Sequence, residues 1–235
     1  MNTNSTSDKT TVHNVIILDR SGSMQSIRFE AMTGCNEVIS AARKAKEKYS
    51  DTMDQVLSIV LFDSVSVDTL EWDSDPMSAK DLTPETYIPG AATPLYDAIG
   101  STVTRLERQI KAQGGDHSVT VTIITDGYEN SSREYSMGMI KSMISRLKTE
   151  GWSFAYMGAD HDVEKVSHSI SITSTYKFNK SADGTREMFE KERMAKERYW
   201  DKIDRMRKED PNLSYDERKS RYRKFSDEYL DEDKK

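Results

Sequence analysis

One short stretch near the N-terminus, residues 12–24 with the sequence VHNVIILDRSGSM, limits the folds open to this chain. Its first half is apolar and β-branched and ends in a Ser/Gly turn, which is typical of a strand buried on both faces. Residues just past the carboxyl end of such a strand face the crevice where open α/β sheets bind ligands. Asp19, Ser21 and Ser23 occupy alternate positions there. Their oxygens can converge on one point, as a hard cation such as Mg²⁺ requires.

The rest of the chain alternates between apolar strand-like runs and helical stripes. Further strands are predicted at 56–62, 119–125, 152–157 and 175–178, with an antiparallel edge strand at 65–72. Helices are predicted around 31–42, 94–110, 140–147 and 163–169. This alternation predicts an α/β fold, a doubly wound and mostly parallel sheet with helices on both faces.

Two later segments place further oxygen-bearing side chains at strand ends or helix starts. Pro94 is tolerated in the first turn of a helix, so Thr93 is predicted to be the N-cap of the helix that follows. The strand at 119–125 ends in Asp126-Gly127, another acid directly after a buried run. Taken singly, Asp19 can be a turn acid, Thr93 a helix cap and Asp126 part of an Asp-Gly turn.

Taken together and in this order, these residues resemble the metal-ion-dependent adhesion site of the von Willebrand factor type A (vWA) domain. The residues that match are Asp19, Ser21, Ser23, Thr93 and Asp126. The resemblance covers roughly residues 10 to 180. The segment ILDRSGSM is similar to the corresponding segment in the compact intracellular members of prokaryotes and phages. It implies the Rossmann-like vWA fold and a non-catalytic, metal-dependent protein-binding function.

The resemblance also implies a division of roles within the site. Ser21, Ser23 and Thr93 would bind Mg²⁺ (or Mn²⁺) directly or through water, while Asp19 and Asp126 would act mainly through bridging water. An Asp or Glu of a partner protein would then take the open coordination position. Some intracellular members of the family work beside AAA+ ATPases, so an AAA+ ATPase is one implied partner, by analogy only.

Three alternatives remain open from the sequence. A Mg²⁺-dependent phosphohydrolase resembling the haloacid dehalogenases would use Asp19 as nucleophile, with Asp160 and Asp162 as later acids. Ser21 stands where that chemistry needs a second carboxyl as general acid, which disfavours this alternative. A serine hydrolase would need a G-x-S-x-G turn that Ser21 and Ser23 lack. A vestigial site in a purely structural domain is the third.

The composition limits which binding partners and which cellular compartment we expect. The net charge of −6 disfavours binding to a nucleic-acid backbone. The single cysteine fits a reducing compartment, and no apolar run reaches the roughly 18 to 20 residues that cross a bilayer. Residues 1–10 lack the features of a secretory signal and are predicted to be a disordered lead-in. We therefore expect a cytoplasmic protein with no membrane contact.

The composition changes near residue 180, where the vWA-like part, 11–180, is predicted to end. Residues 181–235 contain 16 Lys and Arg and 16 Asp and Glu, and we predict a charged helical extension. Asp210-Pro211 should break it into two helices, the second beginning with an S-x-x-E capping box at Ser214 and Glu217. Its apolar stripes are expected to pack on the sheet or on each other. The alternatives are a partner-binding helical arm, which could also self-associate, and partial disorder.

Overall fold

The protein is described by a computed structural model that places residues 9–159 and 162–230. Its strands are β1 (Thr10–Asp19), β2 (Met53–Phe62), β3 (Val67–Ser74), β4 (His117–Thr125), β5 (Ser153–Gly158) and β6 (Ser174–Lys177). They form one sheet in the order β3-β2-β1-β4-β5-β6, in which only β3 runs antiparallel to its neighbour. The predicted doubly wound, mostly parallel sheet is confirmed. Most of the predicted lead-in, as well as Asp160, lies outside the described residues.

Strand β1 lies in the middle of the sheet and is buried on both faces, as its sequence predicts. Val12, Ile16 and Leu18 point into one hydrophobic core. Val15 and Ile17, at the intervening positions, point into the other. This alternation follows from the two-residue period of a strand, and it fixes β1 as the element that both cores share.

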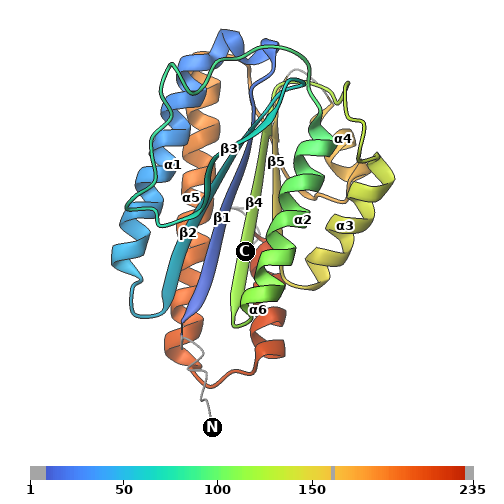
Figure 1. Ribbon diagram of the computed structural model, residues 1–235. Helices are drawn as coiled ribbons and strands as arrows, with labels where there is room; N and C mark the ends of the chain where they lie inside the picture. Colours follow the sequence, from blue (N-terminus) through green and yellow to red (C-terminus); the bar gives the residue numbers. More distant parts are fainter. Residues whose placement is uncertain (1–8, 160–161, 231–235) are drawn as a thin grey trace.

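Helices cover both faces of the sheet (Figure 1). They are α1 (Arg28–Lys48), α2 (Leu95–Gln113), α3 (Met137–Thr149), α4 (Val163–Ser169), α5 (Ala182–Glu209) and α6 (Tyr215–Asp227), with a 3₁₀ helix, η1 (Gly22–Ile27), before α1. Buried residues of α1, α5 and α6 belong to one core, and those of α2, α3 and α4 to the other. The predicted arrangement of helices on both faces is therefore confirmed.

The C-terminal helices pack against the rest of the chain. Tyr199, Trp200 and Ile203 of α5 are buried in the core that also contains α1 and β1. The Trp200 indole Nε1 donates a hydrogen bond to Asn14 Oδ1 on β1, at 3.2 Å. These residues of the α5 stripe are thus covered within the same chain.

Two local signals at the end of the chain have the predicted structure. Helix α5 ends at Glu209, directly before Asp210-Pro211. Helix α6 then begins with the predicted capping box, because the Ser214 hydroxyl and the Glu217 carboxylate each accept from the other residue's backbone N–H. In the described part of the chain, no helix combines the length and apolarity needed to cross a membrane.

Candidate metal site

The candidate site lies at the edge of the sheet where the parallel strands end, at the top of Figure 1. Asp19 is the last residue of β1, and Asp126 directly follows the neighbouring strand β4. Because β1 and β4 are parallel and paired, their carboxyl ends meet at this edge. The topology therefore brings together residues that are more than one hundred positions apart in the sequence.

Asp19 is fully buried and rigidly oriented. Its Oδ1 accepts the Ser21 backbone N–H at 2.7 Å, and its Oδ2 accepts the Thr125 hydroxyl at 2.6 Å. Burial raises the pKa of Asp19 to about 6, although the hydrogen bonds from Thr125 and Ser21 oppose this shift. A buried carboxylate with a raised pKa gains from a nearby cation, which would offset its desolvation.

Ser21, Ser23 and Asp126 form a continuous set of oxygens. The Ser21 and Ser23 hydroxyl oxygens are 3.0 Å apart, and the Ser23 hydroxyl donates to Asp126 Oδ1 at 2.5 Å. Neighbouring oxygens around an octahedral Mg²⁺ are about 3 Å apart, since each lies roughly 2.1 Å from the ion. The spacing of the two serine hydroxyls fits that requirement.

Thr93 joins the site from the start of α2, although it does not cap that helix. Pro94 is the N-cap residue, so the predicted capping role of Thr93 is wrong. Its backbone N–H instead donates to Asn130 Oδ1 at 2.8 Å, and its carbonyl accepts the Asn130 N–H. A Cβ on Gly127 would lie 3.6 Å from Thr93 Oγ1 and 3.7 Å from Ser23 Oγ, so both hydroxyls border the same small space.

The donors are three hydroxyls and two carboxylates, and this chemistry suits a hard divalent cation. No cluster of three or more His, Cys, Asp or Glu side chains arranged to hold a metal occurs among the described residues. The softer metals that need imidazole or thiolate ligands therefore have no set of ligands in that part of the chain. The five predicted residues fit Mg²⁺ or Mn²⁺ by the type and placement of their oxygens.

Two residues that the sequence did not single out also belong to the site. Thr125 orients Asp19 through its hydroxyl, and its position at the end of β4 was the only available signal. Lys180, in the loop between β6 and α5, places its Nζ 2.8 Å from Asp126 Oδ2. The sequence alone gives no sign of this contact, because whether a lysine in a loop lies near Asp126 depends on the order of the strands in the sheet.

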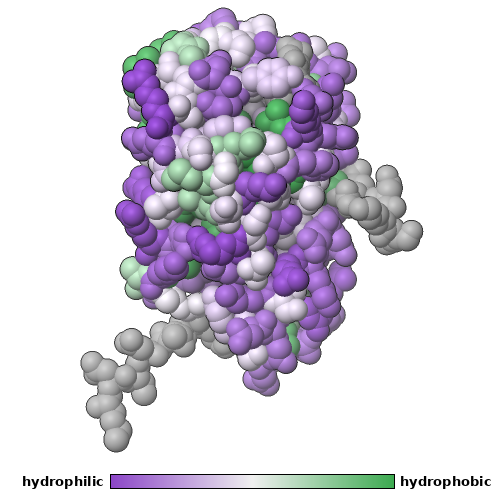
Figure 2. Space-filling model, turned by 90° about the vertical axis from the view of Figure 1, so that its right-hand side faces the viewer, coloured by the Kyte–Doolittle hydropathy of each residue, from purple (hydrophilic) through white to green (hydrophobic). Residues whose placement is uncertain are grey.

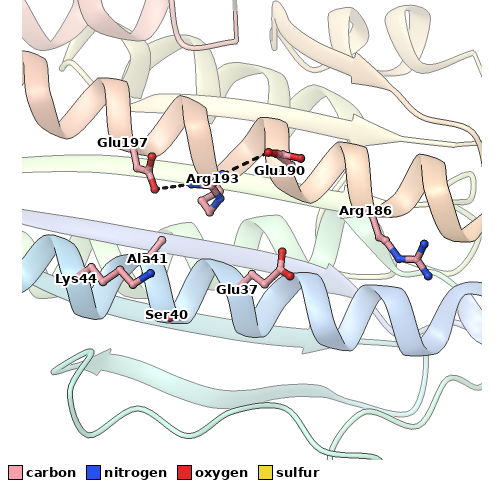
Figure 3. Close-up of a pocket in the computed structure, with 8 residues that line it drawn as sticks. All are labelled: Glu37, Ser40, Ala41, Lys44, Arg186, Glu190, Arg193 and Glu197. Atoms are coloured by element: carbon pink, nitrogen blue, oxygen red, sulfur yellow. Dashed lines mark hydrogen bonds and ion pairs between the residues drawn. The ribbon is translucent and has the colours of Figure 1, made fainter.

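Two surface hollows lie elsewhere, and none of the five predicted residues lines either one. The larger lies between α1 and α5 and is bordered by side chains of both signs, among which Arg193 pairs with Glu190 and Glu197 (Figure 3). The smaller one, lined by Phe29, Met32 and Pro84 among others, lies where η1 meets α1. The face shown in Figure 2 is mostly hydrophilic, with its apolar residues in small separate patches.

Comparison with solved structures finds proteins that match most of this chain. The pilus adhesin SpaC from Lactobacillus rhamnosus GG matches 79% of this chain with a TM-score of 0.53 and 10% identity, over 30% of its own length. The SpRpn10 VWA domain matches 77% of this chain and 93% of its own, with a TM-score of 0.49 and 9% identity. A von Willebrand factor type A protein from Catenulispora acidiphila matches 79% of this chain and 42% of its own, with a TM-score of 0.48 and 15% identity. The chain has the vWA fold.

This likeness is one of fold. No family model and no curated protein sequence matches the chain. The chain spans less than half of the SpaC and Catenulispora structures. At these identities the fold does not determine the function, which depends on the side chains at the strand ends.

Proposed function

We propose that this vWA domain is a non-catalytic protein-binding module that depends on a divalent cation. Domains with this fold are generally binding modules. The observation that supports the proposal most directly is the chain of contacts from Asp19 through Ser21 and Ser23 to Asp126. Thr93 borders the same space.

In this proposal Ser21, Ser23 and Thr93 hold Mg²⁺ or Mn²⁺, and Asp19 and Asp126 supply negative charge. When bound, the cation would accept an oxygen ligand from outside the chain. An Asp or Glu side chain of a partner protein is the ligand we propose, because it is an anionic oxygen donor. Intracellular proteins such as AAA+ ATPases are the candidate partners, in keeping with the proposed cytoplasmic location.

A metal titration tests the first half of the proposal. Thermal unfolding is measured in EDTA and at increasing Mg²⁺ or Mn²⁺, because a cation that binds only the folded state must stabilise it. The double variant Ser21→Ala/Ser23→Ala should lose the shift. Ser26→Ala, on the exposed side of η1, is the matched control and should keep it. No shift in the unaltered protein would contradict metal binding.

Affinity capture tests the second half. Partners bound in Mg²⁺ should be lost both in EDTA and with Ser21→Ala/Ser23→Ala, and should be retained by Ser26→Ala. A phosphatase assay with p-nitrophenyl phosphate and Mg²⁺ tests the competing hydrolase. Turnover that Asp19→Asn abolishes would overturn the binding-module proposal. Asp19 is a poorly placed nucleophile in this structure, because it is fully buried and both of its oxygens accept hydrogen bonds.

A further inference from the structure

A lysine ammonium lies inside the proposed metal site. Lys180 Nζ is 2.8 Å from Asp126 Oδ2; the Asp126 side chain has 0% of its surface exposed and the Lys180 side chain 19%. Lys180 follows β6, which is two strands away from β4 in the sheet. The side chain therefore reaches along the carboxyl edge of the sheet to the strand end that carries Asp126.

The contact occupies the oxygen of Asp126 that the serines leave unused. Oδ1 accepts the Ser23 hydroxyl, whereas Oδ2 is buried and accepts no hydrogen bond from the described residues. Lys180 Nζ forms an ion pair with this buried oxygen at 2.8 Å. A buried carboxylate needs such a countercharge, because an unpaired buried charge is strongly unfavourable.

We propose that Lys180 is a tethered cation that competes electrostatically with the divalent metal and thereby lowers its affinity for the site. The inference rests on the proposed function. The ammonium neutralises one of the two carboxylates that would balance the ion, and it repels a second cation placed among the same oxygens. The burial of the pair reduces screening by solvent, so the effect should exceed that of a surface lysine.

Three variants isolate the charge of Lys180. Lys180→Met removes the charge and keeps much of the side-chain length, whereas Lys180→Arg keeps the charge. Lys177→Met removes the same charge from an exposed residue at the end of β6 and is the matched control. The probe is Mn²⁺ alone, with free Mn²⁺ measured by its electron paramagnetic resonance signal during titration of each protein.

We expect Lys180→Met to bind Mn²⁺ about ten-fold or more tightly than the unaltered protein. Lys180→Arg and Lys177→Met should both stay within about three-fold of it. In EDTA, Lys180→Met should unfold at a lower temperature, since Asp126 loses its counterion, and saturating Mg²⁺ should raise its midpoint by more than that of the unaltered protein.

The outcomes separate this inference from the proposed function. If the unaltered protein binds Mn²⁺ and Lys180→Met binds it equally or more weakly, the competition is refuted while the metal site stands. If Lys180→Met alone binds Mn²⁺ measurably, the competition is supported, whereas metal-dependent binding by the unaltered protein is refuted. If neither protein binds Mn²⁺ at millimolar concentration, the metal site and the competition are refuted together.

Discussion

Gly34 of α1 lies directly against Phe189 of α5. A Cβ atom on Gly34 would come within 2.7 Å of the Phe189 Cβ and closer still to the ring. The two helices can approach only because residue 34 has no side chain, and they do so over one face of the sheet. Helix α5 therefore packs closely against α1 at the contact between Phe189 and Gly34.

Gly34→Ala should destabilise the protein by about 1–2 kcal/mol, because the cost of overpacking exceeds the gain in helix propensity. Urea unfolding followed by circular dichroism measures the change. Gly138→Ala on α3 is the matched control, since a Cβ there would meet only the Ser136 hydroxyl at 4.0 Å. Gly138→Ala should be neutral or slightly stabilising. Equal stability of both variants would contradict the close packing of α1 on α5.

A second prediction concerns Glu192 and Lys196, an ion pair at 3.1 Å in which both side chains have 0% exposure. Lys196→Met leaves the Glu192 carboxylate buried without its counterion and should cost about 3–5 kcal/mol of unfolding free energy. The double variant Glu192→Leu/Lys196→Met removes both charges and should recover most of this loss. A double variant as unstable as Lys196→Met alone would show that the hydrogen bonds that Glu192 accepts from Thr122 and Tyr229 matter more than the ion pair.

Asp19→Asn should stabilise the protein in EDTA while removing its response to Mg²⁺. Because burial raises the pKa of Asp19 to about 6, the ionised carboxylate costs stability above that pH. The cost is absent below the unfolded pKa near 4 and grows as the pH rises from about 4 to 6. We expect a gain of about 3 kcal/mol near neutral pH and none near pH 4, measured by thermal unfolding. A loss of stability in EDTA at neutral pH would contradict this prediction.

A fourth prediction concerns acid stability through Glu107, which joins α2 to α3. Both of its oxygens lie 2.8 Å from nitrogens of Arg146, and this pairing lowers the pKa of Glu107 to about 2. The stability it contributes is present above pH 4.5 and is lost as the pH falls from there to about 2.

Glu107→Gln should therefore cost about 1 kcal/mol near neutral pH, a modest value because the Arg146 side chain is 46% exposed. The difference from the unaltered protein should shrink as the pH falls below about 4 in urea unfolding. Glu150→Gln removes the other partner of Arg146, which bonds through a single oxygen, and should cost less. A pH-independent effect of Glu107→Gln would point to packing rather than charge.

The strand and helix pattern was largely predictable, and the exceptions have physical causes. The edge strand β3 begins at Val67 rather than at 65, and its register with β2 is irregular, which no local signal specifies. Thr93 has the residue type of an N-cap, but its backbone pairs with Asn130, so the helix begins one residue later. That pairing joins residues 37 positions apart and lies beyond the reach of capping rules.

The sequence by itself determined the alternation of strands and helices, the buried central strand β1, the capping box at Ser214 and the five candidate ligands. Each of these features can be predicted from the periodicity of apolar residues or from residue types a few positions apart. Only the tertiary structure decided that Lys180 meets Asp126, that Thr125 orients Asp19 and that α5 completes a core. These contacts depend on strand order and register, which set distances between residues that share no local pattern.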